Sequence, residues 1–94
     1  MLNSIILINA ERTKINEVAD KLASTDGISE VYSVAGKYDL IAIVRVKSND
    51  DLANLVTNEL SKFESITRTE TLIAFRAISL HDLEAMFSFG FEEK

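Results

Sequence analysis

The apolar residues of this chain follow two different periods, and the order in which these periods alternate limits the folds that the chain can adopt. Four segments are rich in apolar and β-branched residues, as strands are: residues 5–8, 28–35, 40–46 and 67–76. Two others carry apolar residues three and four positions apart, as amphipathic helices do: residues 15–23 and 52–63. The sequence therefore predicts the order strand, helix, strand, strand, helix, strand.

Residues at the segment boundaries support this order. Thr13 is expected to cap the first helix, and Gly27 is expected to end it in a left-handed conformation. Ser48 and Asp51 have the spacing of a capping box, which predicts the start of the second helix. Residues 36–39, G-K-Y-D, lie between two strand segments and predict a hairpin turn.

This order of elements is typical of an α+β sandwich of the ferredoxin-like βαββαβ type, with a four-stranded antiparallel sheet and both helices on one face. Residues 1–78 are expected to form this single domain. Residues 79–94 are expected to form a C-terminal extension that is helical and lies at a subunit interface. Its apolar residues recur at helical spacing: Leu80, Leu83, Met86 and Phe87.

The predicted sheet is apolar on both faces. In the third strand, Leu40, Ala42 and Val44 alternate with Ile41 and Ile43. An antiparallel sheet with one face in water alternates apolar with polar residues, so the face without helices is expected to be buried against another subunit. The alternation does not decide which set faces outward. We therefore expect a homo-oligomer, built as a dimer and then as a ring of dimers.

The charge and composition exclude several classes of function. The formal net charge is −5 and the Lys and Arg residues are not clustered, so direct nucleic-acid binding is not expected. The absence of cysteine excludes a disulfide scaffold, a thiolate nucleophile and a zinc-thiolate site. The apolar runs are too short to span a membrane, and no basic region precedes the first one. A cytoplasmic protein without membrane contact, metal or other cofactor is expected.

Two motifs carry the candidate binding chemistry. Residues 34–40 read V-A-G-K-Y-D-L, a glycine turn that ends in the carboxylate of Asp39. Residues 67–71 read T-R-T-E-T, which places hydroxyl groups at every second position: Thr67, Thr69 and Thr71. A carboxylate accepts hydrogen bonds from an ammonium group, while hydroxyls and turn amides donate to a carboxylate. Together the motifs fit a small zwitterion.

Both motifs resemble those of the effector-binding domain of leucine-responsive and asparagine-type (Lrp/AsnC) transcriptional regulators, also called the regulation-of-amino-acid-metabolism domain. V-A-G-K-Y-D-L is similar to the family's V-x-G-x-[FY]-D-[LY] turn, and T-E-T-L-I is similar to its T-x-T-hydrophobic final strand. The resemblance runs from Leu2 to Ile78. It implies an amino-acid pocket between adjacent dimers, with ligand contacts from six residues: Gly36, Tyr38, Asp39, Thr67, Thr69 and Thr71.

Full-length members of that family carry a helix–turn–helix domain ahead of the effector domain, and this chain begins at the first strand. The resemblance therefore implies a stand-alone effector domain. Such a domain is not an enzyme. It senses an amino acid and modulates transcription through a full-length, DNA-binding relative.

Other readings of the same pattern remain open. Small dimeric ferredoxin-like enzymes, such as isomerases or monooxygenases, usually need a buried histidine or an Asn/His/Trp set, but this chain has no Trp and its single histidine, His81, follows the last strand. ACT-type regulatory domains usually bind ligand at a glycine after the first strand, where this chain reads N-A-E-R-T. Gly36 and Asp39 can also serve the turn alone, and threonine favours strands without any ligand.

Overall fold

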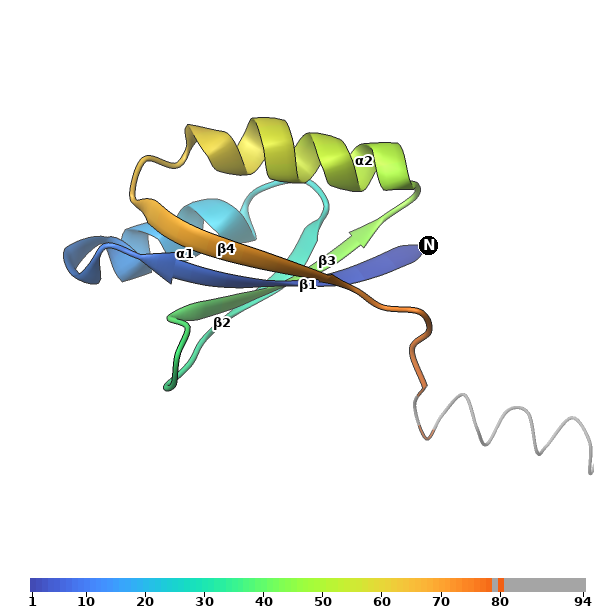
Figure 1. Ribbon diagram of the computed structural model, residues 1–94, viewed down its shortest axis with the longest axis horizontal. Coiled ribbons are helices and arrows are strands. Elements are labelled where there is room, and N and C mark those ends of the chain that lie inside the picture. The colour runs from blue at the N-terminus through green and yellow to red at the C-terminus, as the bar shows by residue number, and fades with distance from the viewer. Residues whose placement is uncertain (79, 81–94) are drawn as a thin grey trace, which may run out of the picture.

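The computed structural model describes residues 1–78 and residue 80. The elements follow the predicted order (Figure 1): β1 (Leu2–Ala10), α1 (Ile15–Ala23), β2 (Ile28–Ser33), β3 (Leu40–Val46), α2 (Asn49–Asn54) and β4 (Ile66–Ile73). A 3-10 turn, Arg12–Lys14, precedes α1. α2 continues as a π-helical turn, Leu55–Glu59, and a 3-10 turn, Leu60–Lys62.

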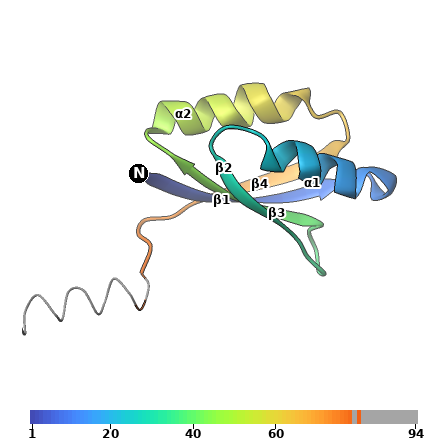
Figure 2. The ribbon, with the colours of Figure 1, turned by 180° about the vertical axis from the view of Figure 1, so that it is seen from behind.

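The four strands form one antiparallel sheet in the order β2-β3-β1-β4. β1 is central, so Ile6 pairs with Ala42 of β3 on one side and with Thr71 of β4 on the other. Both helices lie on the same face of the sheet (Figures 1 and 2). The prediction of a ferredoxin-like α+β sandwich is confirmed.

The hydrophobic core lies between the helices and the sheet face that they cover. Strands β1, β2 and β3, helix α1, and helix α2 with the two turns that continue it supply the buried apolar residues: Ile6, Ile8, Ala10, Val18, Leu22, Ile28, Leu40, Ala42, Val44, Val46, Leu52, Leu55 and Leu60. Ser4 is also buried, and its hydroxyl donates to the carbonyl oxygen of Leu72 at 3.0 Å. This bond satisfies the polar group inside the core.

The other sheet face, here called the outer face, is not covered by either helix (Figures 1 and 2). Cross-strand partners share a face, so the register defines its members. Its centre is apolar: Ile5, Leu7, Tyr32, Ile41, Ile43 and Leu72. Polar residues of the same strands surround this centre: Asn3, Asn9, Glu30, Arg45, Arg68 and Glu70. The structure thus decides what the alternation left open, because Ile41 and Ile43 point outward.

The helix boundaries match the sequence in part. Ser48 caps α2 as predicted, and its hydroxyl accepts the N–H of Asp51 at 3.2 Å. The prediction for Thr13 is wrong: it lies inside the 3-10 turn that redirects the chain after β1, and α1 begins without a side-chain cap. Gly27 has a positive φ of 96°, but it lies in the turn into β2, after α1 has ended at Ala23.

Two predicted strands end earlier than expected. The segment 28–35 is a strand only to Ser33, because the N–H of Val34 donates to the carbonyl oxygen of Asp39 and closes the turn. The segment 67–76 is a strand only to Ile73, and the N–H of Ala74 makes one further hydrogen bond, to the carbonyl oxygen of Asn3. The predicted extension, residues 79–94, lies outside the described residues apart from the exposed Leu80. No helix among residues 1–78 is long and apolar enough to cross a membrane.

Candidate functional site

The turn between β2 and β3 presents a bare stretch of backbone. Gly36 has a φ of 142°, a conformation that side-chain-bearing residues rarely adopt. No atom lies within 4 Å of the position that a Cβ on Gly36 would occupy. The backbone conformation therefore calls for glycine, while the space beside it is open within the subunit.

Asp39, at the end of this turn, is fixed against the end of β1. Its N–H donates to the carbonyl oxygen of Ile8 at 3.0 Å, and its carboxylate Oδ2 accepts the N–H of Ala10, also at 3.0 Å. Nothing in the local sequence predicts this contact with β1, because it joins residues 29 positions apart. Within the described part of the chain, the hydrogen bonds of this carboxylate involve Oδ2 only.

Tyr38 reaches across the outer face to β4. Its hydroxyl donates to Oε1 of Glu70 at 2.9 Å, and the guanidinium carbon of Arg68 lies 5.8 Å from the centre of its ring. The hydrogen bond to Glu70 stabilises the protonated phenol and is the main reason that the pKa of Tyr38 is raised. The threonines of T-R-T-E-T were predicted as site residues, whereas Arg68 and Glu70 of the same motif were not. Strand alternation could have indicated Arg68 and Glu70, because it places both residues on the face opposite the threonines.

The threonines of β4 lie on the helix side of the sheet. Thr69 and Thr71 pair with Ile8 and Ile6, whose side chains are buried in the core. Thr67 lies where the register between β1 and β4 shifts. Thr67 and Thr69 line a shallow groove of about 280 Å³ between β4 and the end of the α2 segment.

The turn at residues 34–39 and the threonines of β4 belong to the same sheet, but their side chains do not meet at one site. Asp39 contacts Ala10, and Ala10 pairs with Ile66, so the turn and Thr67 lie at the same end of the sheet with β1 between them. Tyr38 lies on the outer face, whereas the side chains of Thr69 and Thr71 lie on the helix side. One subunit therefore does not place both motifs around one small ligand.

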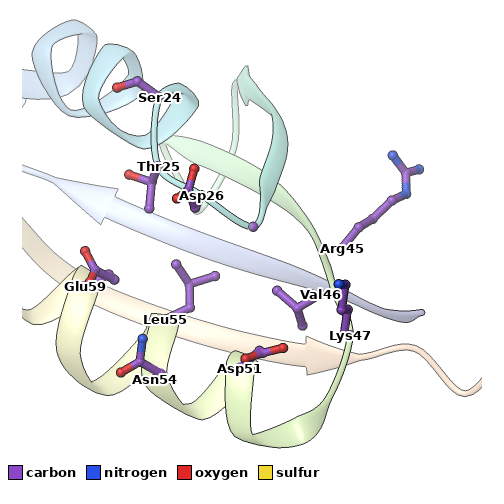
Figure 3. A pocket seen from close by; sticks show the side chains of 11 residues that line it. Ser24, Thr25, Asp26, Arg45, Val46, Lys47, Asp51, Asn54, Leu55 and Glu59 are labelled. Atoms are coloured by element: carbon purple, nitrogen blue, oxygen red, sulfur yellow. The ribbon is translucent and has the colours of Figure 1, made fainter.

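A larger cleft of about 660 Å³ opens between the α1–β2 connection, the end of β3 and α2 (Figure 3). Its walls mix carboxylates, cations and apolar groups: Ser24, Thr25, Asp26, Gly27, Arg45, Val46, Lys47, Asp51, Asn54, Leu55 and Glu59. The Thr25 hydroxyl donates to the Lys21 carbonyl at 2.8 Å, and Arg45 donates to the Ser29 hydroxyl at 3.1 Å. Neither predicted motif contributes to this cleft. Among residues 1–78, no group of three or more His, Asp or Glu could hold a metal ion.

The fold defines the class of this chain as an α+β sandwich of the ferredoxin-like type. Residues 3–83 match the family described as the Lrp/AsnC ligand binding domain. The chain belongs to this family.

Known relatives agree with this assignment. The HTH-type transcriptional regulator FL11 of Pyrococcus furiosus is 33% identical over 73 residues, which cover 78% of this chain and 48% of FL11. The crystal structure of TTHA0845 from Thermus thermophilus is 38% identical, with a TM-score of 0.79 over 84% of this chain and 99% of that one. This chain spans about half the length of the curated relatives that it matches.

A more distant structure shares the fold alone. The transcriptional regulator NMB0573 from Neisseria meningitidis, solved as a complex with L-methionine, is 11% identical and has a TM-score of 0.75, covering 83% of this chain and 52% of that one. FL11 and NMB0573 are both named as transcriptional regulators, and neither is named as an enzyme.

Proposed function

We propose that this domain binds a free amino acid in the cytoplasm and passes the signal to transcription through a DNA-binding member of its family. Membership in a ligand-binding family supports the first step, as does the L-methionine complex of NMB0573. The acidic net charge of −5 supports an indirect effect on DNA. The topology of residues 1–78 also supports an indirect effect on DNA. A DNA-binding helix–turn–helix needs two adjacent helices, whereas two strands separate α1 from α2 here.

The observation that carries the proposal is the geometry of the turn at residues 34–39. Gly36 offers backbone without a side chain to open space, and Asp39 ends the same turn with a carboxylate that β1 holds in place. An α-amino acid carries an ammonium and a carboxylate close together. The carboxylate of Asp39 accepts from the ammonium, while backbone amides of the turn donate to the ligand carboxylate. The half-buried side chain of Tyr38 lies beside Gly36 and Asp39 and shapes the site.

The proposed assembly begins with a dimer that packs the outer faces of two copies together. The apolar centre of that face supports this, because Ile5, Tyr32 and Leu72 are exposed there without a partner in their own subunit. Thr69 and Thr71 lie on the helix side, so such a dimer leaves them accessible. A ring of dimers then allows the turn of one dimer to approach the threonines of the next, which completes a site that one subunit leaves divided.

A thermal-shift screen of the twenty amino acids tests the proposed function. A ligand that binds only the folded state stabilises it by about 2.7 kcal/mol at a hundredfold excess over its dissociation constant. For a domain of this size, that corresponds to a rise of roughly 10–20 °C in melting temperature. We expect at least one amino acid to raise the melting temperature of the wild-type domain and to raise that of Asp39→Asn by less than half as much. If no amino acid shifts the wild type, the proposed function is wrong.

A further inference from the structure

β4 forms one edge of the sheet. Among the described strands its single neighbour is β1, so none of them lies along its other side, which is here called the free edge (β4 is orange in Figure 1). The residues from Thr67 to Glu70 are exposed, and so are Leu72 and Ile73. An edge strand presents a row of unpaired backbone N–H and C=O groups, which can pair with a further strand.

β4 lacks several of the features that protect sheet edges from such pairing. Its sequence, I-T-R-T-E-T-L-I, contains no Pro, Gly or Lys. Its register with β1 is regular from Arg68 to Ile73, and the one irregularity lies at its start, near Thr67. β2, the other edge strand, is shorter, and a register shift between Ile28 and Glu30 interrupts its pairing. The free edge of β4 is therefore the better surface for a further strand.

The backbone groups of successive β4 residues point alternately to β1 and to the free edge. The N–H of Ala74, directly after β4, donates to the carbonyl oxygen of Asn3, which places the even-numbered residues of this strand on the β1 side. The N–H and C=O groups of Thr69, Thr71 and Ile73 consequently point to the free edge. Two antiparallel strands must align their edge-facing residues, so a second β4 can pair here only with odd-numbered residues opposite odd-numbered ones.

The charges of β4 favour one register for two copies. Arg68 and Glu70 are the only ionisable residues of this strand, and both lie on the outer face. If a two-fold axis passes beside Thr69, Arg68 of each copy lies opposite Glu70 of the other. An axis at Arg68 or at Glu70 would instead place like charges opposite one another. Opposite charges across two strands stabilise their pairing and like charges destabilise it, so β4 is complementary to itself in this register.

The surroundings of the two charged residues leave them suited to this pairing. Tyr38 orders both, because its hydroxyl donates to Oε1 of Glu70 and its ring lies beside the guanidinium of Arg68. The ion pairs within the described part of the chain involve neither residue. On the helix side of β4, Thr69 is exposed, so the helix layer does not cover the strand at the proposed axis.

We infer that the free edge of β4 is a docking surface for β4 of a second copy of this chain, paired antiparallel about Thr69. The two four-stranded sheets then join edge to edge into one continuous sheet, with the helices of both copies on the same side. This contact rests neither on amino-acid binding nor on the packing of two outer faces. It is short, so two otherwise separate chains form it at high protein concentration.

Disulfide trapping tests the register directly, because the wild-type chain contains no cysteine. Directly opposed residues that exchange backbone hydrogen bonds have Cα atoms about 5.5 Å apart, which a disulfide can span. We therefore expect Thr69→Cys to form a covalent dimer when it is oxidised at high protein concentration. A dimer through the outer faces does not mimic this link, because the side chain of Thr69 lies on the helix side.

Thr71→Cys is the matched control, since Thr71 lies on the same strand and the same face. In the proposed register the two copies of this position lie roughly 13 Å apart along the strands, too far for a disulfide. We expect Thr71→Cys to remain unlinked under the same conditions. Preferential linking of Thr71→Cys, or no link at either position, overturns the proposed pairing.

Charge reversal tests the reason for the register. In the Thr69→Cys background, Arg68→Glu places two carboxylates opposite one another and should slow disulfide formation roughly tenfold. Adding Glu70→Arg restores opposite charges in the same register and should restore the rate. Melting temperatures of the reduced variants verify that each keeps its fold.

Two results of the charge reversal contradict the inference. An unchanged rate with Arg68→Glu alone overturns the role of the charges, and so does a rate that stays slow after Glu70→Arg is added. Neither result bears on amino-acid binding, which the thermal-shift screen tests separately.

Discussion

Asp39 combines a structural contact through Oδ2 with the proposed contact to a ligand, and two substitutions separate these roles. Asp39→Ala removes the acceptor for the N–H of Ala10. Ala10 itself is buried, with an exposed fraction of 9%. An unpaired buried donor costs about 1–3 kcal/mol, so the free energy of unfolding should fall by that amount. Asp39→Asn keeps an oxygen at the same place and should remain within about 1 kcal/mol of the wild type. Urea denaturation measures both. Equal stability of Asp39→Ala and the wild type would show that the contact with β1 contributes nothing.

The two tyrosines provide an optical measurement of the outer face. The chain has no Trp and only two Tyr, so tyrosinate absorbance reports Tyr32 and Tyr38 alone. Hydrogen bonds to Glu30 and Glu70 raise the pKa of Tyr32 and of Tyr38, respectively, above the ordinary value of 10.0. We expect Glu70→Gln, measured with Tyr32→Phe in the background, to lower the pKa of Tyr38 because a neutral acceptor favours the protonated phenol less.

The sign of the linked stability follows from the raised pKa of Tyr38. The folded state favours the protonated phenol, so this contribution to stability is complete below about pH 10 and is lost as the pH rises through the raised pKa. Glu70→Gln should therefore reduce the difference between stability at neutral and at strongly alkaline pH. An identical pKa of Tyr38 with and without the Glu70 carboxylate would contradict the hydrogen bond at 2.9 Å.

At the scale of single elements, the start of α2 depends on one hydroxyl. Ser48→Ala removes the acceptor for the N–H of Asp51 and should destabilise the domain by about 1 kcal/mol. Ser24→Ala is the matched control, because the Ser24 hydroxyl is exposed and only donates to carbonyl oxygens at the end of α1. Its effect should lie within about 0.5 kcal/mol. Thermal unfolding compares the two, and equal losses would argue against the cap.

The elements that the sequence predicted well are those with a strong local signal. β3 begins and ends where its apolar run does, and Ser48 starts α2 through a bond within its own first turn. The prediction that Thr13 caps α1 was wrong because Thr13 lies within the 3-10 turn that redirects the chain after β1. The end of β4 had no local signal either, because the apolar run continues to Phe75 whereas the pairing with β1 stops at Ser4 and Ile73.

The candidate site was only partly visible in the sequence. The two motifs gave its residue types, and the positive φ of Gly36 fits the predicted turn. Strand alternation alone could not show that Ile41 faces outward, because the alternate residues of β3 are equally apolar. The bond between Asp39 and Ala10 joins residues 29 positions apart and has no local signature. The separation of Tyr38 from the threonines appears only when the register with β1 is known.

At the scale of the whole molecule, one strand supplies a matched test of the proposed dimer. Leu72 and Ile73 are neighbours with similar exposed fractions, 45% and 53%, but Leu72 lies on the outer face and Ile73 pairs with the buried Ser4 on the helix side. Leu72→Asp places a charge in the proposed interface and should yield a monomer, because an unpaired charge resists burial. Ile73→Asp should leave the dimer intact. Light scattering at micromolar concentration distinguishes them, and the same mass for both variants would argue against the outer face as the interface.

The central claim is that the turn at residues 34–39 binds an amino acid, and isothermal titration calorimetry with the amino acid found in the screen tests it most directly. A charge-assisted hydrogen bond contributes about 1.5–3 kcal/mol, so Asp39→Asn should weaken binding by roughly ten- to a hundredfold while the domain keeps its fold. Thr71→Val removes only a hydroxyl and should weaken binding less. Saturable binding by the wild type with this order of losses is the predicted result. Equal affinity of Asp39→Asn and the wild type would contradict the account, because Asp39 would then serve the contact with β1 alone.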